Sequence, residues 1–528
     1  MRRFVLSITA TLVMTASLVF ASSGSGGTWD DILSKVPEKW RDGVGRSLDL
    51  AAAGMNDGEL LAALNTYPAG TAKFRAVCFL IANMEKNAYV DYVNPKDPLN
   101  PFSPENEDVD WTREYVWDYS AMKSDILIEN VEWAFLAREK FPWCRNLPED
   151  IFFQYVLPYR STQEPIVSWR PAIYGGLAPL VEGLHTAREV AEKINNYNRD
   201  RFHFDPLYYR HPEDRDIPTC IATGAGRCED MSNLSNYSLR ALGVPTTSDF
   251  TPWWPKGDNN HAWNAVYDNG RWYSFMGCEP STSPLWDGIK TSTFAKVYRN
   301  SFSADPIMGS APDGTKPPRL MRSPAIDVTR EYSSVSNIEI EVDNPAKATY
   351  LCVYNYGTWQ AVAGAWAEDG RVRYPDLGNH DILYCATQYV ENAAGWGDHL
   401  PVARPFVLHQ NGQIEFTELA AQDGIRGDIV LTGWSSGSPL TAGSQVSLFC
   451  YSPAKDTGAA DDGKPHASMA WSLVGNVSAA DISGKPTAAF KAAAFENGLY
   501  ILSDSDDPEK LKEGSRPFIW KDGTIVYY

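Results

Sequence analysis

The sequence predicts an α+β protein with a helical N-terminal part, a mixed core, and two β-sandwich-like domains behind it. Apolar residues recur at helical spacing through the first part of the chain. After residues 316–318 the texture changes to short alternating runs bounded by Asn, Asp, Gly and Pro, and this second part contains an internal repeat. At 528 residues the chain is too long for one core, and its length suggests about three or four domains.

Residues 28–120 are expected to form the helical N-terminal region. The helical spacing is clearest at Phe74, Val77, Ile81 and Met84, which would make one buried stripe within a helical stretch over 29–83. Residues 93–108 are rich in Pro, Asn and Asp, and this composition predicts a loop between elements.

The mixed core is expected at residues 121–315. A helix is predicted over 124–140, with Ser124 as its N-cap and an apolar face that includes Val131 and Phe135. A further helix is predicted over 177–197 from the spacing of its apolar residues.

The repeat in the second part consists of the same strand-like elements in the same order. The first set has Leu351, Cys352, Val353, Tyr354, Trp359, Leu383, Tyr384, Arg404, Pro405, Phe406, Asn411 and Gly412, and the second has Leu448, Phe449, Cys450, Tyr451, Trp471, Leu499, Tyr500, Arg516, Pro517, Phe518, Asp522 and Gly523. Each set closes on a turn dipeptide. We therefore expect two related β-sandwich-like domains, at 320–416 and 417–528, each of about a hundred residues.

The net charge of the chain restricts its possible partners, and its first residues indicate the compartment. The net charge of −19 argues against nucleic acid, because binding phosphates requires concentrated Lys and Arg. Residues 1–3 are basic at two positions, 4–20 are uncharged and apolar, and 21–24 are small. This pattern is typical of a signal peptide (1–21), with a retained membrane anchor as the alternative. We expect a secreted, periplasmic or cell-surface protein without stable membrane insertion after signal removal.

The eight cysteines give no sign of a metal site. They are scattered over the chain without a CxxC pair, so we expect no zinc and no other metal. Disulfide pairing in an oxidising compartment stays open, and several cysteines are expected to be ordinary buried apolar residues.

Cys228 is the exception. It follows Gly224 and Gly226, and Met231 and Leu234 then begin a helical stripe, which predicts that the thiol lies at the N-terminal end of a helix. Unpaired N–H groups and the positive end of the helix dipole gather there and favour a thiolate, the reactive form of cysteine. The same N–H groups could stabilise an oxyanion. Cys228 is therefore the candidate nucleophile.

His261 is the candidate base. Alternation over 261–267 predicts a strand, and residues 268–270 (DNG) predict a hairpin turn into a second strand. If Tyr267 pairs with Arg271, Glu279 becomes the diagonal neighbour of His261, within reach of a long side chain. Glu279 is thus the candidate third member of a Cys–His–acid arrangement, and an exposed turn residue is the alternative.

These motifs resemble the core of the transglutaminase-like superfamily. The resemblance rests on residues 226–230 (GRCED), 239–245 (LRALGVP), 261–264 (HAWN), Trp272 and 279–281 (EPS), and it is similar in arrangement to exported bacterial members with trailing β domains. It implies a papain-like α+β core with a Cys–His–Asp triad. The family usually has the Asp four residues after the second-strand Trp, where this chain has Met276, and a bulge through Gly277 would be needed to bring Glu279 into that place.

The tryptophans near the motifs are candidate substrate-binding residues. Trp253, Trp254 and Trp263 could wall an acyl-donor groove, or they could form a packing cluster. The tryptophans of the repeats could stack on a glycan, although core packing is the other interpretation.

The resulting hypothesis is a thiol-dependent acyl-transfer enzyme that cleaves amide bonds through a Cys228 thioester and needs no cofactor. Family analogy favours a peptidase or amidase over a protein cross-linker, with a peptide, protein or amide-containing substrate at the cell surface. The alternative is a catalytically retired binding or scaffolding module whose β domains recognise a glycan or peptide.

Overall fold

The fold was analysed in a computed structural model of the chain. The structure describes residues 29–93, 112–211, 214–279, 286–309, 317–342, 348–391, 397–417, 429–432, 440–453, 469–483, 485–490, 498–506, 516–521 and 524–528. The expected signal peptide and most of the expected loop at 93–108 lie outside these residues.

Four helices occupy the N-terminal stretch that was predicted to be helical. They are α1 (Asp30–Lys35), α2 (Glu38–Ala53), α3 (Asp57–Thr66) and α4 (Ala72–Ala82), followed by the short 3₁₀ helix η1 (Met84–Lys86). Phe74, Val77, Ile81 and Met84 are all buried, so the predicted stripe is confirmed. An antiparallel hairpin of β1 (Ala88–Val93) and β2 (Thr112–Trp117) follows, which the sequence pattern did not predict.

The next helices cover the core, and they differ from the predicted helices in two details. They are α5 (Asp118–Ala121), α6 (Ser124–Lys140), α7 (Pro142–Arg145), α8 (Glu149–Tyr155), α9 (Arg170–Leu177), the 3₁₀ helix η2 (Ala178–Val181) and α10 (Ala187–Arg199). The helix at 124–140 is confirmed, but its N-cap is Lys123, and the Ser124 hydroxyl donates instead to Glu59.

The prediction of a single helix over 177–197 was wrong. Gly183 has a positive φ of 82°, which ends the preceding helical turn. The long helix α10 restarts after Thr186, which forms a capping box with Glu189.

The central helix of the core is α12 (Cys228–Ala241), which packs on a five-stranded sheet. The sheet has the order β7-β6-β5-β8-β9, from β5 (Thr246–Thr251), β6 (His261–Asp268), β7 (Arg271–Phe275), β8 (Tyr298–Asn300) and β9 (Ala325–Asp327). Before α12 come β3 (His203–Phe204), the 3₁₀ helix η3 (Pro206–Arg210), α11 (Ile217–Thr223) and β4 (Ala225–Gly226). After the sheet's hairpin come η4 (Gly288–Thr291), η5 (Arg319–Arg322) and α13 (Thr329–Tyr332).

The N-terminal helices and the core share one hydrophobic cluster, which runs from Ile32 to Phe302. All residues of α12 except Glu229 are buried, because α10, α9 and the sheet surround it. The helix that begins at Cys228 is therefore held from several sides, which fixes the position of its first turn.

The second half of the chain forms two β modules with the same strand order. Module 1 has the sheet β12-β11-β14-β16-β17, with β15 paired to β14, and the pair β10-β13; module 2 has the sheet β20-β19-β23-β24-β25 and the sheet β18-β22-β21. Their bounds are β10 (Val335–Glu341), β11 (Ala348–Asn355), β12 (Thr358–Trp366), β13 (Arg371–Gly378), β14 (Ile382–Glu391), β15 (Gly397–Pro401), β16 (Phe406–Leu408), β17 (Ile414–Phe416), β18 (Ile429–Thr432), β19 (Gln445–Pro453), β20 (Met469–Ser478), β21 (Ala480–Ile482), β22 (Lys485–Phe490), β23 (Gly498–Ser503), β24 (Pro517–Lys521) and β25 (Thr524–Tyr527).

The internal repeat seen in the sequence is a repeat of structure. The ladder of β11 with β12 shifts register between Leu351 and Cys352, and that of β19 with β20 shifts between Leu448 and Phe449. These are the positions that the sequence repeat aligned, so the same β-bulge occurs in both modules.

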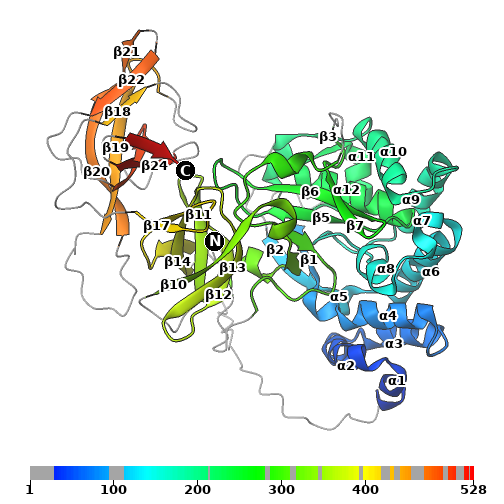
Figure 1. The fold of residues 1–528 in the computed structure, drawn as a ribbon. Helices are drawn as coiled ribbons and strands as arrows, with labels where there is room; N and C mark the ends of the chain where they lie inside the picture. Colours follow the sequence, from blue (N-terminus) through cyan, green and yellow to red (C-terminus); the bar gives the residue numbers. More distant parts are fainter. Residues whose placement is uncertain are drawn as a thin grey trace, which may run out of the picture.

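The two modules pack on each other through an aromatic cluster that includes Tyr354, Trp359, Tyr451 and Trp471. Figure 1 shows module 1, in yellow, between the green core and the orange module 2, and the blue N-terminal helices at the other end. Among the described residues, no helix combines the length and the apolar character needed to cross a bilayer.

Candidate active site

The turn before α12 places Cys228 through two glycines. Gly224 has a φ of 65° at the end of α11, a conformation that glycine adopts without strain. Gly226 lies so close to its neighbours that a Cβ atom there would be 2.5 Å from Nη2 of Arg215 and 2.6 Å from Oδ2 of Asp230. A side chain at 226 would therefore push the turn away from Arg215 and Asp230.

A buried ion pair fixes the same turn. Arg215 donates to Oδ2 of Asp230 at 3.2 Å and to the Ala225 carbonyl at 2.6 Å, and Asp230 also accepts the N–H of Arg227 at 3.0 Å. Asp230 thereby satisfies a backbone donor ahead of the first turn of α12. Arg215 is 15 residues from Asp230 in the sequence, so no local pattern reveals this pair.

Cys228 is the first residue of α12, as predicted, and only 5% of its surface is exposed. Its Sγ donates to Oε2 of Glu229 at 3.0 Å, and it also receives the backbone N–H of Ala262. Burial, together with the charge and hydrogen bond of Glu229, raises the pKa of the thiol well above its usual range. The resting group is therefore a neutral thiol, whereas the helix-start argument alone had favoured the thiolate.

His261 begins β6, directly before the residue whose N–H meets the Cys228 sulfur. The Cys228 sulfur thus meets the backbone one residue after His261, and the described contacts include no hydrogen bond between the thiol and the imidazole. Burial lowers the pKa of His261, so its imidazole is neutral at neutral pH and can accept a proton.

The hairpin register differs by one residue from the expected register. Tyr267 pairs with Trp272, because Asn269 and Gly270 both have positive φ (50° and 84°) and form a two-residue turn. The ladder ends at the pair of Asn264 with Phe275, and its continuation makes Met276 the diagonal neighbour of His261.

The ring of His261 accordingly contacts Met276, with Nε2 3.4 Å from Sδ. Among the described residues, no carboxylate is hydrogen-bonded to this ring. Glu279 lies in the turn after β7, half-buried beside Cys278, and burial raises its pKa. The N–H of Cys278 and the carbonyl of Met276 are both held by Asn195 of α10, which fixes this turn.

The three candidate tryptophans occupy different places. Trp254 stacks on His261 with ring centroids 6.1 Å apart, and Trp263 packs behind the same ring at 6.0 Å. Trp263 is fully buried and donates to the Tyr332 hydroxyl, so it supports the imidazole and has no surface for a substrate. Trp253 packs against the cluster of module 1, edge-on to Tyr356.

The family of this segment is decided by its match to a family model. The model of the transglutaminase-like superfamily matches residues 177–276, which contain Cys228, His261 and Met276. Residues 177–276 form a transglutaminase-like domain. The resemblance stated from the motifs is thereby confirmed.

Solved structures that match this chain include a candidate cysteine protease from Cytophaga hutchinsonii, with 16% identity, a TM-score of 0.22, and 28% of this chain and 48% of that chain covered. A candidate protease from Parabacteroides distasonis matches with 14% identity, a TM-score of 0.19, and coverage of 38% and 33%. Red sea bream transglutaminase matches with 8% identity, a TM-score of 0.18, and coverage of 83% and 78%. The chain thus spans about half of the first structure and a third of the second. No curated protein matches it.

The transglutaminase-like domain has one further side chain at the thiol, which the sequence did not reveal. Tyr209 of η3 has its hydroxyl 3.9 Å from the Cys228 sulfur and also hydrogen-bonds to Asn259. Its ring meets Phe204 edge-on at 6.0 Å, and both rings are more than 40% exposed. They form an exposed aromatic pair that reaches the nucleophile through the Tyr209 hydroxyl. No motif marks them, because η3 is a single turn in a segment without periodicity.

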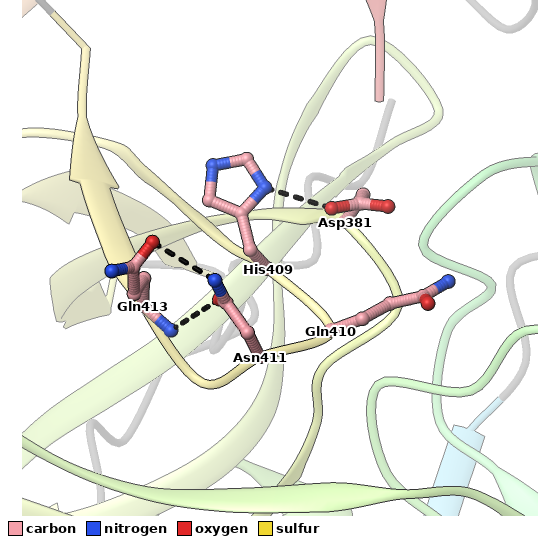
Figure 2. Close-up of a pocket in the computed structure, with 5 residues that line it drawn as sticks. All are labelled: Asp381, His409, Gln410, Asn411 and Gln413. Carbon is pink, nitrogen blue, oxygen red and sulfur yellow. Dashed lines mark hydrogen bonds and ion pairs between the residues drawn. The ribbon is translucent and has the colours of Figure 1, made fainter.

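A polar hollow around His409 lies in module 1 (Figure 2). His409 contacts Asp381 through Nδ1 at 2.7 Å and Glu415 through Nε2 at 3.0 Å. Burial lowers its pKa, but the hydrogen bonds to the two carboxylates prevail and raise it. Lys521 of module 2 bonds to the same Glu415, so the cluster is an ionic link between the modules. Among the described residues, no group of three or more side chains could hold a metal ion.

Proposed function

We propose that the transglutaminase-like domain catalyses acyl transfer from amide bonds through a Cys228 thioester, with hydrolysis as the outcome. The observation that carries this proposal is the position of the Cys228 sulfur. It lies at the N-terminus of the 14-residue helix α12 and against the N–H of Ala262, the residue that follows His261 in β6. Helix-start N–H groups beside a nucleophile are the donors that an oxyanion needs.

The chemistry starts from two neutral groups. The sulfur attacks the amide carbonyl carbon while His261 accepts the thiol proton, and the oxyanion is stabilised by N–H groups at the start of α12. Collapse breaks the C–N bond, and the imidazolium gives its proton to the leaving amine. Water then attacks the thioester with His261 as the base, which releases the carboxylic acid and restores the thiol. A small movement must bring the ring and thiol together and release the sulfur from Glu229.

The substrate proposed is a peptide or another amide-containing molecule outside the cytoplasm. The exposed ring of Tyr209 at the sulfur, with the exposed ring of Phe204 packed against it, supports an acyl donor with some apolar surface. Export is proposed from the basic, apolar and small-residue pattern of residues 1–24.

A second candidate function is a retired transglutaminase-like fold that binds without catalysis. The contact of His261 with Met276 favours it, since a thioether does not balance the charge of an imidazolium. In that case the β modules would carry the recognition of a peptide or glycan.

An activated acyl ester separates the two functions. The full chain is incubated with p-nitrophenyl acetate, and the acyl adduct is located by mass spectrometry, with hydroxylamine to show that it is a thioester. The proposal predicts an adduct on Cys228 that is lost in Cys228→Ser and strongly slowed in His261→Ala. Cys450→Ala is the matched control, because Cys450 is the cysteine of intermediate exposure. An adduct that forms equally in His261→Ala supports the retired fold. Adding a fluorescent primary amine then distinguishes hydrolysis from transfer to an amine.

A further inference from the structure

The segment between β5 and β6 forms a loop that carries Trp254 onto His261. We call residues 254–259 the Trp254 loop. The Trp254 N–H donates to the Asn259 carbonyl at 3.1 Å and closes the loop, and Asn259 has a φ of 76°. Trp254 stacks on the His261 ring, and Asn259 bonds to Tyr209 at the Cys228 sulfur. The loop therefore contacts the His261 ring through Trp254 and the Tyr209 hydroxyl through Asn259.

Module 1 holds this loop through Asn355, the last residue of β11. Its side chain is fully buried, and its Nδ2 donates to the carbonyls of Trp254 at 2.9 Å, of Gly257 at 2.8 Å and of Asn259 at 3.1 Å. Its Oδ1 accepts the Asn259 N–H at 3.1 Å. One buried amide thus contacts four backbone groups of the loop, and among the described contacts it is the partner of the Trp254 carbonyl and of the Asn259 N–H.

Module 2 holds the same loop through Arg516, which directly precedes β24. The guanidinium is 5% exposed and donates to the carbonyls of Pro255 at 2.6 Å and Gly257 at 3.2 Å. It also donates to the carbonyl of Tyr354 in β11 at 2.7 Å. Asp258 lies 3.5 Å away and supplies the opposite charge.

We infer that Asn355 and Arg516 are positioning residues for His261, so that the two β modules complete the active site of the transglutaminase-like domain. The inference rests on the proposed function for its catalytic meaning. Among the residues that the structure describes, the aromatic rings packed against the imidazole are Trp254 and Trp263. Trp263 lies within strand β6, whereas Trp254 lies in the loop that the two β modules hold. Releasing the loop would let the imidazole turn and admit water to it.

The internal repeat offers a matched control. Arg404 occupies the place in module 1 that Arg516 has in module 2, ahead of the same Pro-Phe pair, but Arg404 is exposed. Arg516→Met and Arg404→Met therefore remove the same side chain from equivalent positions of the full chain. Arg516→Lys is the conservative variant, and it retains a donor for one of the carbonyls.

Two readouts test the inference, one of them independent of activity. In Arg516→Met we expect Cys228 acylation by p-nitrophenyl acetate to slow by about 10–100-fold at saturating ester, as for a misplaced catalytic group. We expect the acylation rate to recover in part in Arg516→Lys and to stay at the wild-type value in Arg404→Met. In an NMR titration of histidine-labelled protein, the His261 signal (assigned with His261→Ala) should titrate at higher pH in Arg516→Met, because water reaches the ring.

The outcomes separate this inference from the proposed function. Acylation and His261 titration that are both unchanged in a folded Arg516→Met would overturn the positioning role. A wild-type chain that is never acylated, but whose His261 titration moves in Arg516→Met, overturns the acyl-transfer proposal and supports the positioning. If Arg516→Met does not fold, Asn355→Ala is measured in the same two ways, with the same results for and against.

Discussion

The Sδ atom of Met276 lies 3.4 Å from Nε2 of His261, at the diagonal position of the β6–β7 hairpin. The transglutaminase-like family usually has an aspartate four residues after the second-strand Trp, which is this position. A thioether accepts a hydrogen bond weakly and has no charge, so it leaves the buried imidazolium without compensation. Burial lowers the pKa of His261, and the contact with Met276 does nothing to offset that.

Met276→Asp should strengthen that base. An aspartate oxygen is as many bonds from Cα as the Sδ of methionine, so it can occupy the same place beside Nε2. We expect the pKa of His261 to rise and Cys228 acylation to accelerate by about tenfold or more, because an adjacent carboxylate stabilises the imidazolium. Met276→Leu, which changes the shape without adding charge, should leave both unchanged. Equal rates in the Asp and Leu variants would show that the ring does not act as the base.

Gly226→Ala should disturb the site through the backbone. The added methyl would meet Arg215 and Asp230 at 2.5–2.6 Å, so we expect a loss of about 1–3 kcal/mol of unfolding free energy and slower Cys228 acylation. Gly175→Ala is the control, since this glycine lies in α9 with nothing within 4 Å of the added atom. That variant should gain about 0.5–1 kcal/mol. Thermal unfolding of the two variants checks the contrast, and a Gly226→Ala chain as stable and reactive as the wild type would contradict it.

Cys228 and His261 were predictable because the sequence patterns that mark them are local. Cys228 stands between a Gly-rich turn and a helical stripe, and His261 stands at the start of an alternating run; both patterns are read within about ten residues. The repeat was visible for a similar reason, since its strands recur with their aromatic residues in order. The structure has the helix at Cys228, the strand at His261 and the repeated strands where these patterns predicted them.

The parts of the site that the sequence did not predict depend on the register of a hairpin and on long-range contacts, which local sequence patterns do not determine. Residues 268–270 are compatible with a two- or a three-residue turn, and the one-residue difference brings Met276 rather than Glu279 to the His261 ring. Asn355 is 96 residues and Arg516 about 260 residues from the loop that they hold, so no spacing in the sequence connects them. Long-range polar contacts of this kind follow only from the packed modules.

His399 should make module 1 sensitive to acid. Its Nδ1 lies 3.1 Å from the Thr387 hydroxyl, and the rings of Tyr350 and Tyr389 surround it. Burial lowers its pKa from 6.5 to about 4. The unfolded chain takes up a proton near pH 6.5 but the folded chain only near 4, so stability is complete above 6.5 and falls as the pH drops between these values, by roughly 3 kcal/mol in all. His399→Gln should flatten this slope in thermal unfolding from pH 7 to 4, whereas His185→Gln at an exposed site should keep it. Identical slopes in wild type and His399→Gln would disprove the assignment.

Glu229→Gln should release the nucleophile. In the resting site the Cys228 thiol donates to Glu229 at 3.0 Å, and the negative charge of this carboxylate adds to burial in raising the thiol pKa. Glutamine keeps the size and an acceptor oxygen but removes the charge, so the thiolate fraction at a given pH should rise. We expect iodoacetamide to modify Cys228 about tenfold faster at neutral pH, a difference of about one pKa unit. Glu192→Gln, at an exposed position of α10, makes the same change in net charge and should have no effect. Because alkylation needs the thiolate but not the base, the acceleration should persist in the double variant with His261→Ala; if it vanished there, Glu229 would be acting through the imidazole and not on the sulfur.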